Sequence, residues 1–193
     1  MQDNQGVRVN IKKLAYAGAL VAIGILLPQA FHIFGANAGM LFLPIQIPVL
    51  IAGAILGGIY GGTIGVIVPM LSFLMTGMPP APKVWFMVVE LGIYGLAMGV
   101  LVKKCNIYIT LLISMVLGRV AYAIALGTGV VLLGMQAPFM NQAAFLTGIV
   151  QGVPGIVIQL VLIPILYKRL KDGGFLFEDQ IRRSKKDIEG TKR

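Results

Sequence analysis

The sequence has little charge and little cysteine, and it lacks the common motifs for nucleotide binding and hydrolysis. Only 12% of its 193 residues are charged, whereas a soluble domain has roughly 25%. The single cysteine, Cys105, excludes an internal disulfide and a cysteine metal cluster. No G-x-x-x-x-G-K-[ST], H-E-x-x-H or G-x-S-x-G pattern occurs in the chain. We therefore expect no cofactor and no ATP binding through a P-loop in this chain.

Apolar residues dominate what is present. They make up 58% of the chain, the mean hydropathy is +0.89, and the segment from Leu43 to Gly77 carries no charge at all. A bilayer crossing needs about 20 apolar residues, and backbone groups in lipid must be satisfied within the segment. The sequence therefore predicts an all-α integral membrane protein, with a glycine-rich hinge inside that segment at Gly57, Gly58, Gly61 and Gly62.

Six transmembrane helices are predicted, separated by short loops rich in Gly, Pro, Asn and Lys. Their approximate ranges are 13–34, 42–57, 60–77, 84–103, 107–134 and 145–169. Residues 1–12 are predicted to form a cytoplasmic arm, 13–170 a six-helix substrate-binding domain and 171–193 a basic cytoplasmic tail. The first apolar run is too long for a cleaved signal peptide, so we expect it to stay in the protein.

The distribution of basic residues supports this topology. With both termini in the cytoplasm, fourteen of the sixteen Lys and Arg residues fall on the cytoplasmic side. Lys83 alone lies outside, and Arg119 lies within a helix. Such a bias is typical of multi-pass membrane proteins and favours anionic lipid, not nucleic acid, as the partner of the positive charge.

Glu90 and Arg119 are the two ionisable residues predicted inside the membrane. A charge there costs about 2.5–3.5 kcal/mol on insertion scales, so each indicates a function or a partner. Counting 1.5 Å per residue along their helices places both in the outer half of the bilayer. Two interpretations remain open and are compatible: a structural ion pair, and contact with a polar ligand, for which an Arg fork suits a carboxylate.

Other polar residues also map to the outer ends of the predicted helices or to the outer loops. We take five of them as further candidates for ligand binding: His32, Asn37, Gln46, Trp85 and Asn141. A histidine at a helix end, such as His32, is more often an interface residue than a ligand residue. Trp85 is most simply an interfacial anchor, although its place five residues before Glu90 would also let it stack on a ring. Their position on one side indicates capture from outside.

Small residues four positions apart occur on several helices and allow close helix packing. In the first helix Ala15 and Ala19 form A-x-x-x-A, with Gly18 and Ala22 offset by one register. This small face begins at the cytoplasmic end of the helix. We therefore predict that Ala15, Ala19 and Ala22 dock a partner subunit.

The second and third predicted helices share a set of apolar and small residues: Ile47 to Gly53, Gly57, Tyr60, Gly61, Gly65, Leu71, Thr76 and Gly77. In these residues the two helices resemble those of the substrate-binding S components of energy-coupling-factor (ECF) vitamin transporters, in particular the riboflavin-type branch. The A-x-x-x-A at Ala15 and Ala19 resembles the family's signature for contacting the coupling subunit. The resemblance in length and helix number covers residues 8–170.

This resemblance implies a capture protein for a vitamin-like small molecule in a prokaryotic plasma membrane. It also implies a transmembrane coupling subunit and two cytoplasmic ATPases as partners, and a loop at Phe34 to Phe42 that gates the pocket. The riboflavin branch commonly carries an acidic residue before its Ile-Pro, where this chain has Gln46. Riboflavin, pantothenate and a pyrimidine or thiazole precursor therefore remain open as ligands.

Two alternatives to a capture protein remain. The first is a membrane enzyme that uses Glu90, Arg119 and His32 as acid, base or anion clamp. The second is a structural membrane protein in which Glu90 and Arg119 only neutralise each other. The enzyme lacks a recognised motif, and the structural protein leaves the outer polar residues unexplained.

Overall fold

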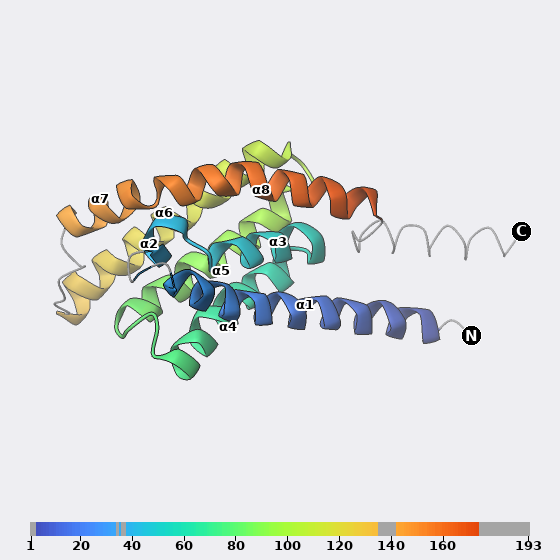
Figure 1. Ribbon diagram of the computed structural model, residues 1–193, viewed down its shortest axis with the longest axis horizontal. Coiled ribbons are helices and arrows are strands. Elements are labelled where there is room, and N and C mark those ends of the chain that lie inside the picture. The colour runs from blue at the N-terminus through green and yellow to red at the C-terminus, as the bar shows by residue number, and fades with distance from the viewer. Residues whose placement is uncertain (1–2, 34, 36–37, 135–141, 174–193) are drawn as a thin grey trace, which may run out of the picture.

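A computed structural model describes residues 3–33, 35, 38–134 and 142–173, and throughout these residues the regular structure is helical (Figure 1). The helices are α1 (Asp3–His32), α2 (Ala38–Phe42), α3 (Gln46–Leu56), α4 (Gly58–Thr76), α5 (Lys83–Leu101), α6 (Ile107–Leu133), α7 (Gln142–Gln151) and α8 (Val153–Asp172). The predicted all-α class is confirmed.

Five of these helices contain a stretch long and apolar enough to cross a bilayer. The stretches are Ile11–Phe31, Gly58–Thr76, Lys83–Leu101, Ile107–Val131 and Val153–Asp172. Helix α3 is equally apolar, but its 11 residues are fewer than the roughly 20 that a full crossing needs. Five helices therefore meet the criterion for a membrane span, where six were predicted.

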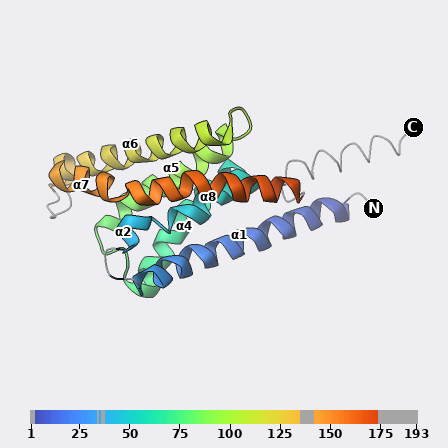
Figure 2. The same ribbon diagram turned by 45° about the horizontal axis from the view of Figure 1, so that its top comes forward.

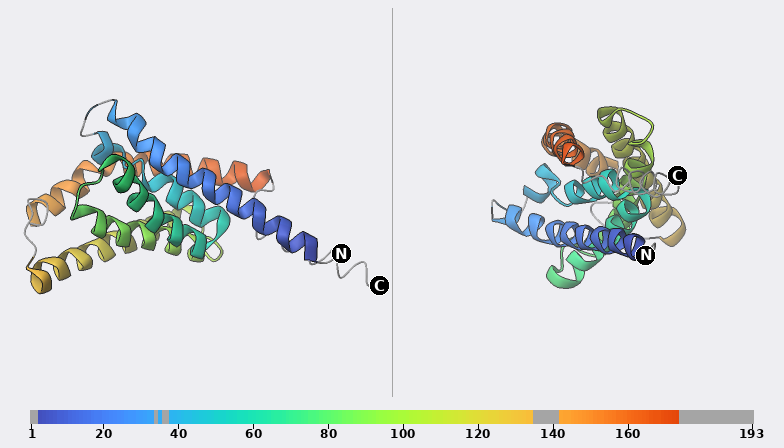
Figure 3. Two further views of the ribbon diagram at one scale, coloured as in Figure 1. Left: turned by 90° about the horizontal axis from the view of Figure 1, so that it is seen from below. Right: turned by 90° about the vertical axis from the view of Figure 1, so that its right-hand side faces the viewer.

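Helix α1 starts earlier than predicted, at Asp3 instead of about residue 13. No proline interrupts residues 3–12, so the polar first turns continue the apolar helix that follows. In Figure 3 these turns extend beyond the rest of the bundle. The first turns of α1 and the last turns of α8 lie at the same end of the bundle, opposite α2 and α7 (Figures 1 and 2).

The last predicted helix is divided in two. Helix α7 ends at Gln151 and α8 begins at Val153, with Gly152 between them. Pro154 lies in the first turn of α8, where its missing N–H is tolerated. Proline at this position would interrupt a continuous helix, because its ring would clash with the backbone carbonyl of the residue four positions before it. Another difference is α2, which occupies Ala38–Phe42 of the predicted gating loop.

The centre of the bundle is formed by α3, α4 and α5, and α4 packs most extensively against α5. Side chains from all three helices, with others from α6 and α8, form one core. Its largest fully buried members include Tyr94, Leu50, Leu91, Met98, Leu111 and Ile163. The predicted hinge between α3 and α4 is confirmed at Gly57, whose φ of 98° is in the range that favours glycine. The other predicted hinge glycines, Gly58, Gly61 and Gly62, belong to α4.

Glycines make the close packing of α3, α4 and α5 possible. A Cβ on Gly95 of α5 would collide with the backbone of Gly61 in α4. A Cβ on Gly61 would in turn lie 2.8 Å from the nitrogen of Gly53 in α3. These contacts involve backbone atoms, which cannot rotate away as a flexible side chain can. The three helices can approach this closely only without side chains at these positions.

We expect Gly95→Ala to lower the free energy of unfolding by about 1–3 kcal/mol, the usual cost of overpacking. Gly127→Ala on α6 is the matched control, because a Cβ there meets nothing within 4 Å. Alanine favours helix over glycine by about 1 kcal/mol, so the control should be neutral or slightly stabilising. Thermal unfolding in detergent, followed by circular dichroism, measures both. Equal stability of the two variants would contradict close packing at Gly95.

Candidate functional site

A cavity of about 370 Å³ lies where α2, α3, α5, α6 and α7 meet. Its lining consists of Gly39, Leu43, Ile45, Gln46, Lys83, Met87, Glu90, Arg119, Tyr122, Ala144, Thr147, Gly148 and Gln151. This volume is within the range of small-molecule sites, which have about 300–1,000 Å³ and few polar groups among apolar ones. The cavity is the leading candidate for a ligand site.

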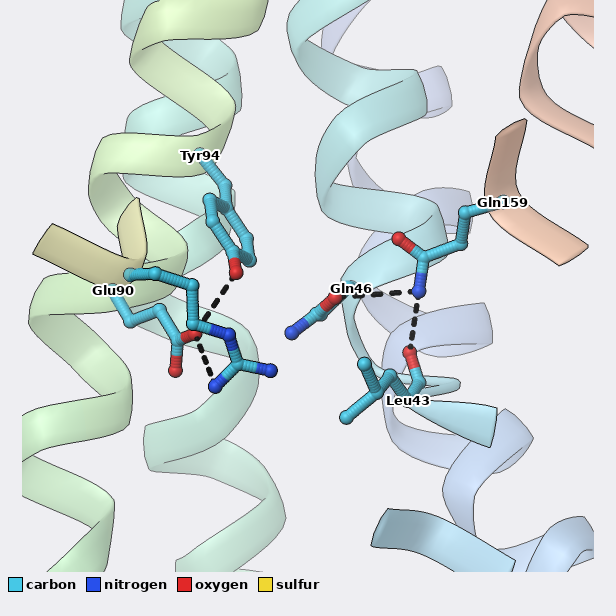
Figure 4. Close-up of polar contacts among 6 residues, drawn as sticks. Leu43, Gln46, Glu90, Tyr94 and Gln159 are labelled. Carbon is cyan, nitrogen blue, oxygen red and sulfur yellow. Dashed lines mark hydrogen bonds and ion pairs between the residues drawn. The ribbon is translucent and has the colours of Figure 1, made fainter. Parts of the chain in front are cut away.

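An ion pair crosses one wall of the cavity. The Nη1 atom of Arg119 on α6 lies 3.0 Å from Oε1 of Glu90 on α5, and Tyr94 donates a hydrogen bond of 2.9 Å to the same carboxylate oxygen (Figure 4). The Glu90 side chain is 4% exposed and that of Arg119 is 22% exposed. The predicted ion pair is confirmed. Arg119 is the more exposed partner, so its guanidinium is more accessible to a ligand in the cavity than the Glu90 carboxylate is.

Local packing determines where the Tyr94 hydroxyl lies. The Tyr94 ring is almost fully buried and occupies the space that a Cβ on Gly118 of α6 would need. Gly118 thus lets the ring lie directly against α6, one residue before Arg119. Tyr94 and Glu90 are four residues apart on α5, so they share one face of that helix. The geometry holds the carboxylate between a phenol and a guanidinium.

Gln46 lines the cavity and is hydrogen-bonded to a second glutamine, Gln159, which does not. The Nε2 atom of Gln159 on α8 donates to Oε1 of Gln46 at 3.3 Å and to the backbone oxygen of Leu43 at 3.4 Å. Gln159 is fully buried and Gln46 is 4% exposed. In Figure 4 the Gln46 side chain lies between Gln159 on one side and Glu90 with Tyr94 on the other. Gln46 therefore links the polar group of Glu90 and Tyr94 to Gln159 on α8.

The structure brings three of the predicted ligand residues to this cavity: Glu90, Arg119 and Gln46. Trp85 lies two residues after Lys83 on α5, but its side chain is 52% exposed and does not line the cavity. His32 ends α1, but its side chain lies outside the described part of the structure, as do Asn37 and Asn141. Their predicted contacts with a ligand remain predictions.

Several lining residues were not selected from the sequence, namely Lys83, Tyr122, Thr147 and Gln151. Lys83 could have been selected as a ligand-binding candidate, because it is the only basic residue that the predicted topology assigns to the outer side. Thr147 and Gln151 lie four residues apart on α7, a spacing that places both on one face of a helix. The sequence predicted α7 only as the first part of a longer helix. No pattern in that longer helix marked the face with Thr147 and Gln151 as a cavity wall.

The predicted docking face of α1 is exposed. Ala15, Ala19 and Ala22 all point away from the core together with Gly18, whereas Ala17, Leu20 and Gly24 face α3 and α4. The exposed positions follow the i, i+3, i+4, i+7 pattern, which is one stripe along a helix. The bundle therefore leaves this small-residue stripe uncovered and available to another helix.

The chemistry that the cavity offers is polar recognition in an otherwise apolar bundle. It presents one carboxylate, two cationic side chains, two amides and two hydroxyls. No group of three or more His, Cys, Asp or Glu side chains that could hold a metal ion occurs within the residues described. These donors and acceptors suit reversible binding of a small polar molecule.

Comparison with known proteins identifies the family. The family model described as "ECF transporter, substrate-specific component" matches residues 12–167, which include every helix that contributes to the cavity. No curated protein and no solved structure matches the chain. Proteins of this family are membrane subunits that bind the transported molecule, are not themselves enzymes, and associate with a coupling component and ATPases. The chain belongs to the substrate-specific components of ECF transporters.

Proposed function

We propose that this chain captures a vitamin-like small polar molecule from outside the cell and binds it in the cavity between α3, α5, α6 and α7. One observation carries the proposal: the cavity gathers Lys83, Arg119 and Gln46 around Glu90, the one acidic side chain between residues 4 and 171. A buried charge in a membrane span is costly, and such residues commonly mark a substrate path.

The topology that we propose has six crossings and both termini in the cytoplasm. The crossings are α1, α3, α4, α5, α6 and the α7–α8 pair, with α3 as a short crossing. The common location of the ends of α1 and α8 supports an even number of crossings (Figures 1 and 2). The excess of Lys and Arg at that end supports a cytoplasmic side. The cavity then opens outward in a prokaryotic plasma membrane.

In this proposal residues 13–170 form the substrate-binding domain, between a cytoplasmic arm (1–12) and a basic cytoplasmic tail (171–193). The exposed stripe of Ala15, Ala19 and Ala22 contacts the coupling subunit, which two ATPases drive. The pattern from Ile47 to Gly53 supports membership of the riboflavin-type branch. Gln46, in place of an acidic residue, argues against riboflavin itself as the ligand.

Mass spectrometry of small molecules that co-purify with the protein is the direct test. We expect one vitamin-like compound at close to one molecule per protein, released on denaturation. A protein that purifies empty and binds no member of a vitamin panel would contradict the proposal. The control is the Gly127→Ala variant, which should co-purify with the same compound because its substitution lies away from the cavity lining.

A further inference from the structure

We propose that the molecule bound in this cavity is a monoanion, in practice a carboxylate, and that Lys83 and the side-chain nitrogen of Gln46 hold its acid group. This inference rests on the proposed capture function and names the chemical class of the ligand. The charges in the cavity and the orientation of two amides support it.

The charges in the cavity do not balance. Glu90 is the sole Asp or Glu between residues 4 and 171, and it pairs with Arg119. Lys83 lines the same cavity and forms no salt bridge within the described part of the chain. One negative and two positive side chains leave the cavity with one uncompensated positive charge. Glu90 attracts Lys83 as well as Arg119, but one carboxylate cannot neutralise two cations. A partly buried charge that stays uncompensated is unfavourable, and a ligand with one negative charge removes that cost.

The amide orientations supply a donor for the same ligand. The backbone oxygen of Leu43 can only accept a hydrogen bond, so the Gln159 atom facing it must be the nitrogen. That nitrogen also faces Gln46, so the Gln46 atom there must be the oxygen. The Gln46 nitrogen consequently points away from Gln159, toward the side of Glu90 and Tyr94 (Figure 4). Gln159 is thus a positioning residue that turns Gln46 into a donor toward the cavity.

The ligand therefore meets several donors in the cavity. The Lys83 ammonium donates, the Gln46 amide keeps a second N–H beside the one that faces the Tyr94 hydroxyl, and the guanidinium of Arg119 retains N–H groups beyond the one facing Glu90. Charge-assisted hydrogen bonds to an ionised acceptor are roughly twice as strong as neutral ones. At about 370 Å³, the cavity suits a small solute and is far too small for a two-chain phospholipid.

Three variants test the inference on the intact protein: Lys83→Met, Lys83→Arg and Lys104→Met. Methionine keeps much of the aliphatic stem of Lys83 and removes its charge. Lys104→Met removes the same charge just beyond the opposite end of α5, where the side chain is exposed. Because Lys83 has no salt bridge to lose, thermal unfolding should show that all three variants fold as the wild type does.

The ligand is first identified by mass spectrometry of the wild-type protein, and its dissociation constant is then measured by calorimetry. We expect a molecule with one acid group. We expect Lys83→Met to bind it at least tenfold more weakly, a loss of about 1.4 kcal/mol, and Lys83→Arg and Lys104→Met to stay within about threefold of the wild type, less than 0.7 kcal/mol. The neutral amide of the same molecule should bind the wild type and Lys83→Met with similar, weak affinity.

The possible failures are distinguishable. A neutral or cationic ligand would overturn the charge assignment while leaving the capture function intact. Phosphatidylglycerol in the organic extract, with no small acid in the aqueous one, would replace the solute by a lipid and also overturn it. Unchanged affinity in Lys83→Met would overturn the role of Lys83. An empty protein that binds none of a vitamin panel would overturn this inference together with the function beneath it.

Discussion

Replacing Arg119 with methionine is expected to lower the free energy of unfolding by about 3–5 kcal/mol, because it leaves the Glu90 carboxylate buried without its cation. The Glu90 side chain is 4% exposed, and it also accepts a hydrogen bond of 2.9 Å from the Tyr94 hydroxyl. A neutral phenol cannot compensate a buried negative charge. Thermal unfolding in detergent measures the loss, and ligand binding should fall at least tenfold, or about 1.4 kcal/mol.

The control is the double variant Glu90→Gln with Arg119→Met. It removes both charges and keeps a side chain that can accept from Tyr94, so most of the stability should return. Ligand binding should remain weak in the double variant if Arg119 contacts the ligand. A single variant as stable as the wild type would refute the structural importance of the pair, and full recovery of binding in the double variant would limit Arg119 to a structural role.

Replacing both Ala15 and Ala19 with tryptophan should abolish uptake and co-purification with the coupling subunit, while ligand affinity stays unchanged. The two alanines lie on the exposed stripe of α1, and small residues four apart let two helix backbones approach closely. An indole at each position would hold the partner helix away. The affected positions lie outside the cavity lining, so the ligand should still bind.

Val157 and Val161 on α8 provide a matched control for this pair. They have the same spacing of four residues, and both are exposed, at 55% and 57%. Tryptophan at these two positions adds the same bulk to a different outer face and should leave uptake near the wild-type level. Co-purification measured by pull-down of the tagged protein, together with uptake in whole cells, reports the outcome. Intact co-purification of the α1 variant would refute the docking proposal.

The sequence was sufficient to predict the helical class, the hinge at Gly57 and the pairing of Glu90 with Arg119. Each has a strong one-dimensional signal. Apolar runs of membrane length predict helices, adjacent glycines predict a turn, and two opposite charges at similar depth in apolar helices have few other partners. For these features the position along the chain nearly determines the position in space.

Other features depend on the rotation of each helix about its axis, which the apolar pattern of a membrane helix hardly reveals. Trp85 and Lys83 illustrate this: they lie two residues apart at the start of α5, yet Lys83 lines the cavity and Trp85 does not. A separation of two residues turns a side chain by about 200° on a helix of 3.6 residues per turn. The division between α7 and α8 was missed because the apolar run continues through Gly152 and Pro154.

The pairing of Glu90 with Arg119 also bears on how the chain enters the bilayer during synthesis. The two residues lie on α5 and α6, consecutive helices joined by the short turn between Leu101 and Ile107. Each charge alone would oppose insertion by about 2.5–3.5 kcal/mol. If α5 and α6 move into lipid together as a hairpin, their charges enter as a neutral pair. The order of helices along the chain thereby lowers the barrier to biogenesis, and moving either helix elsewhere in the chain would raise it.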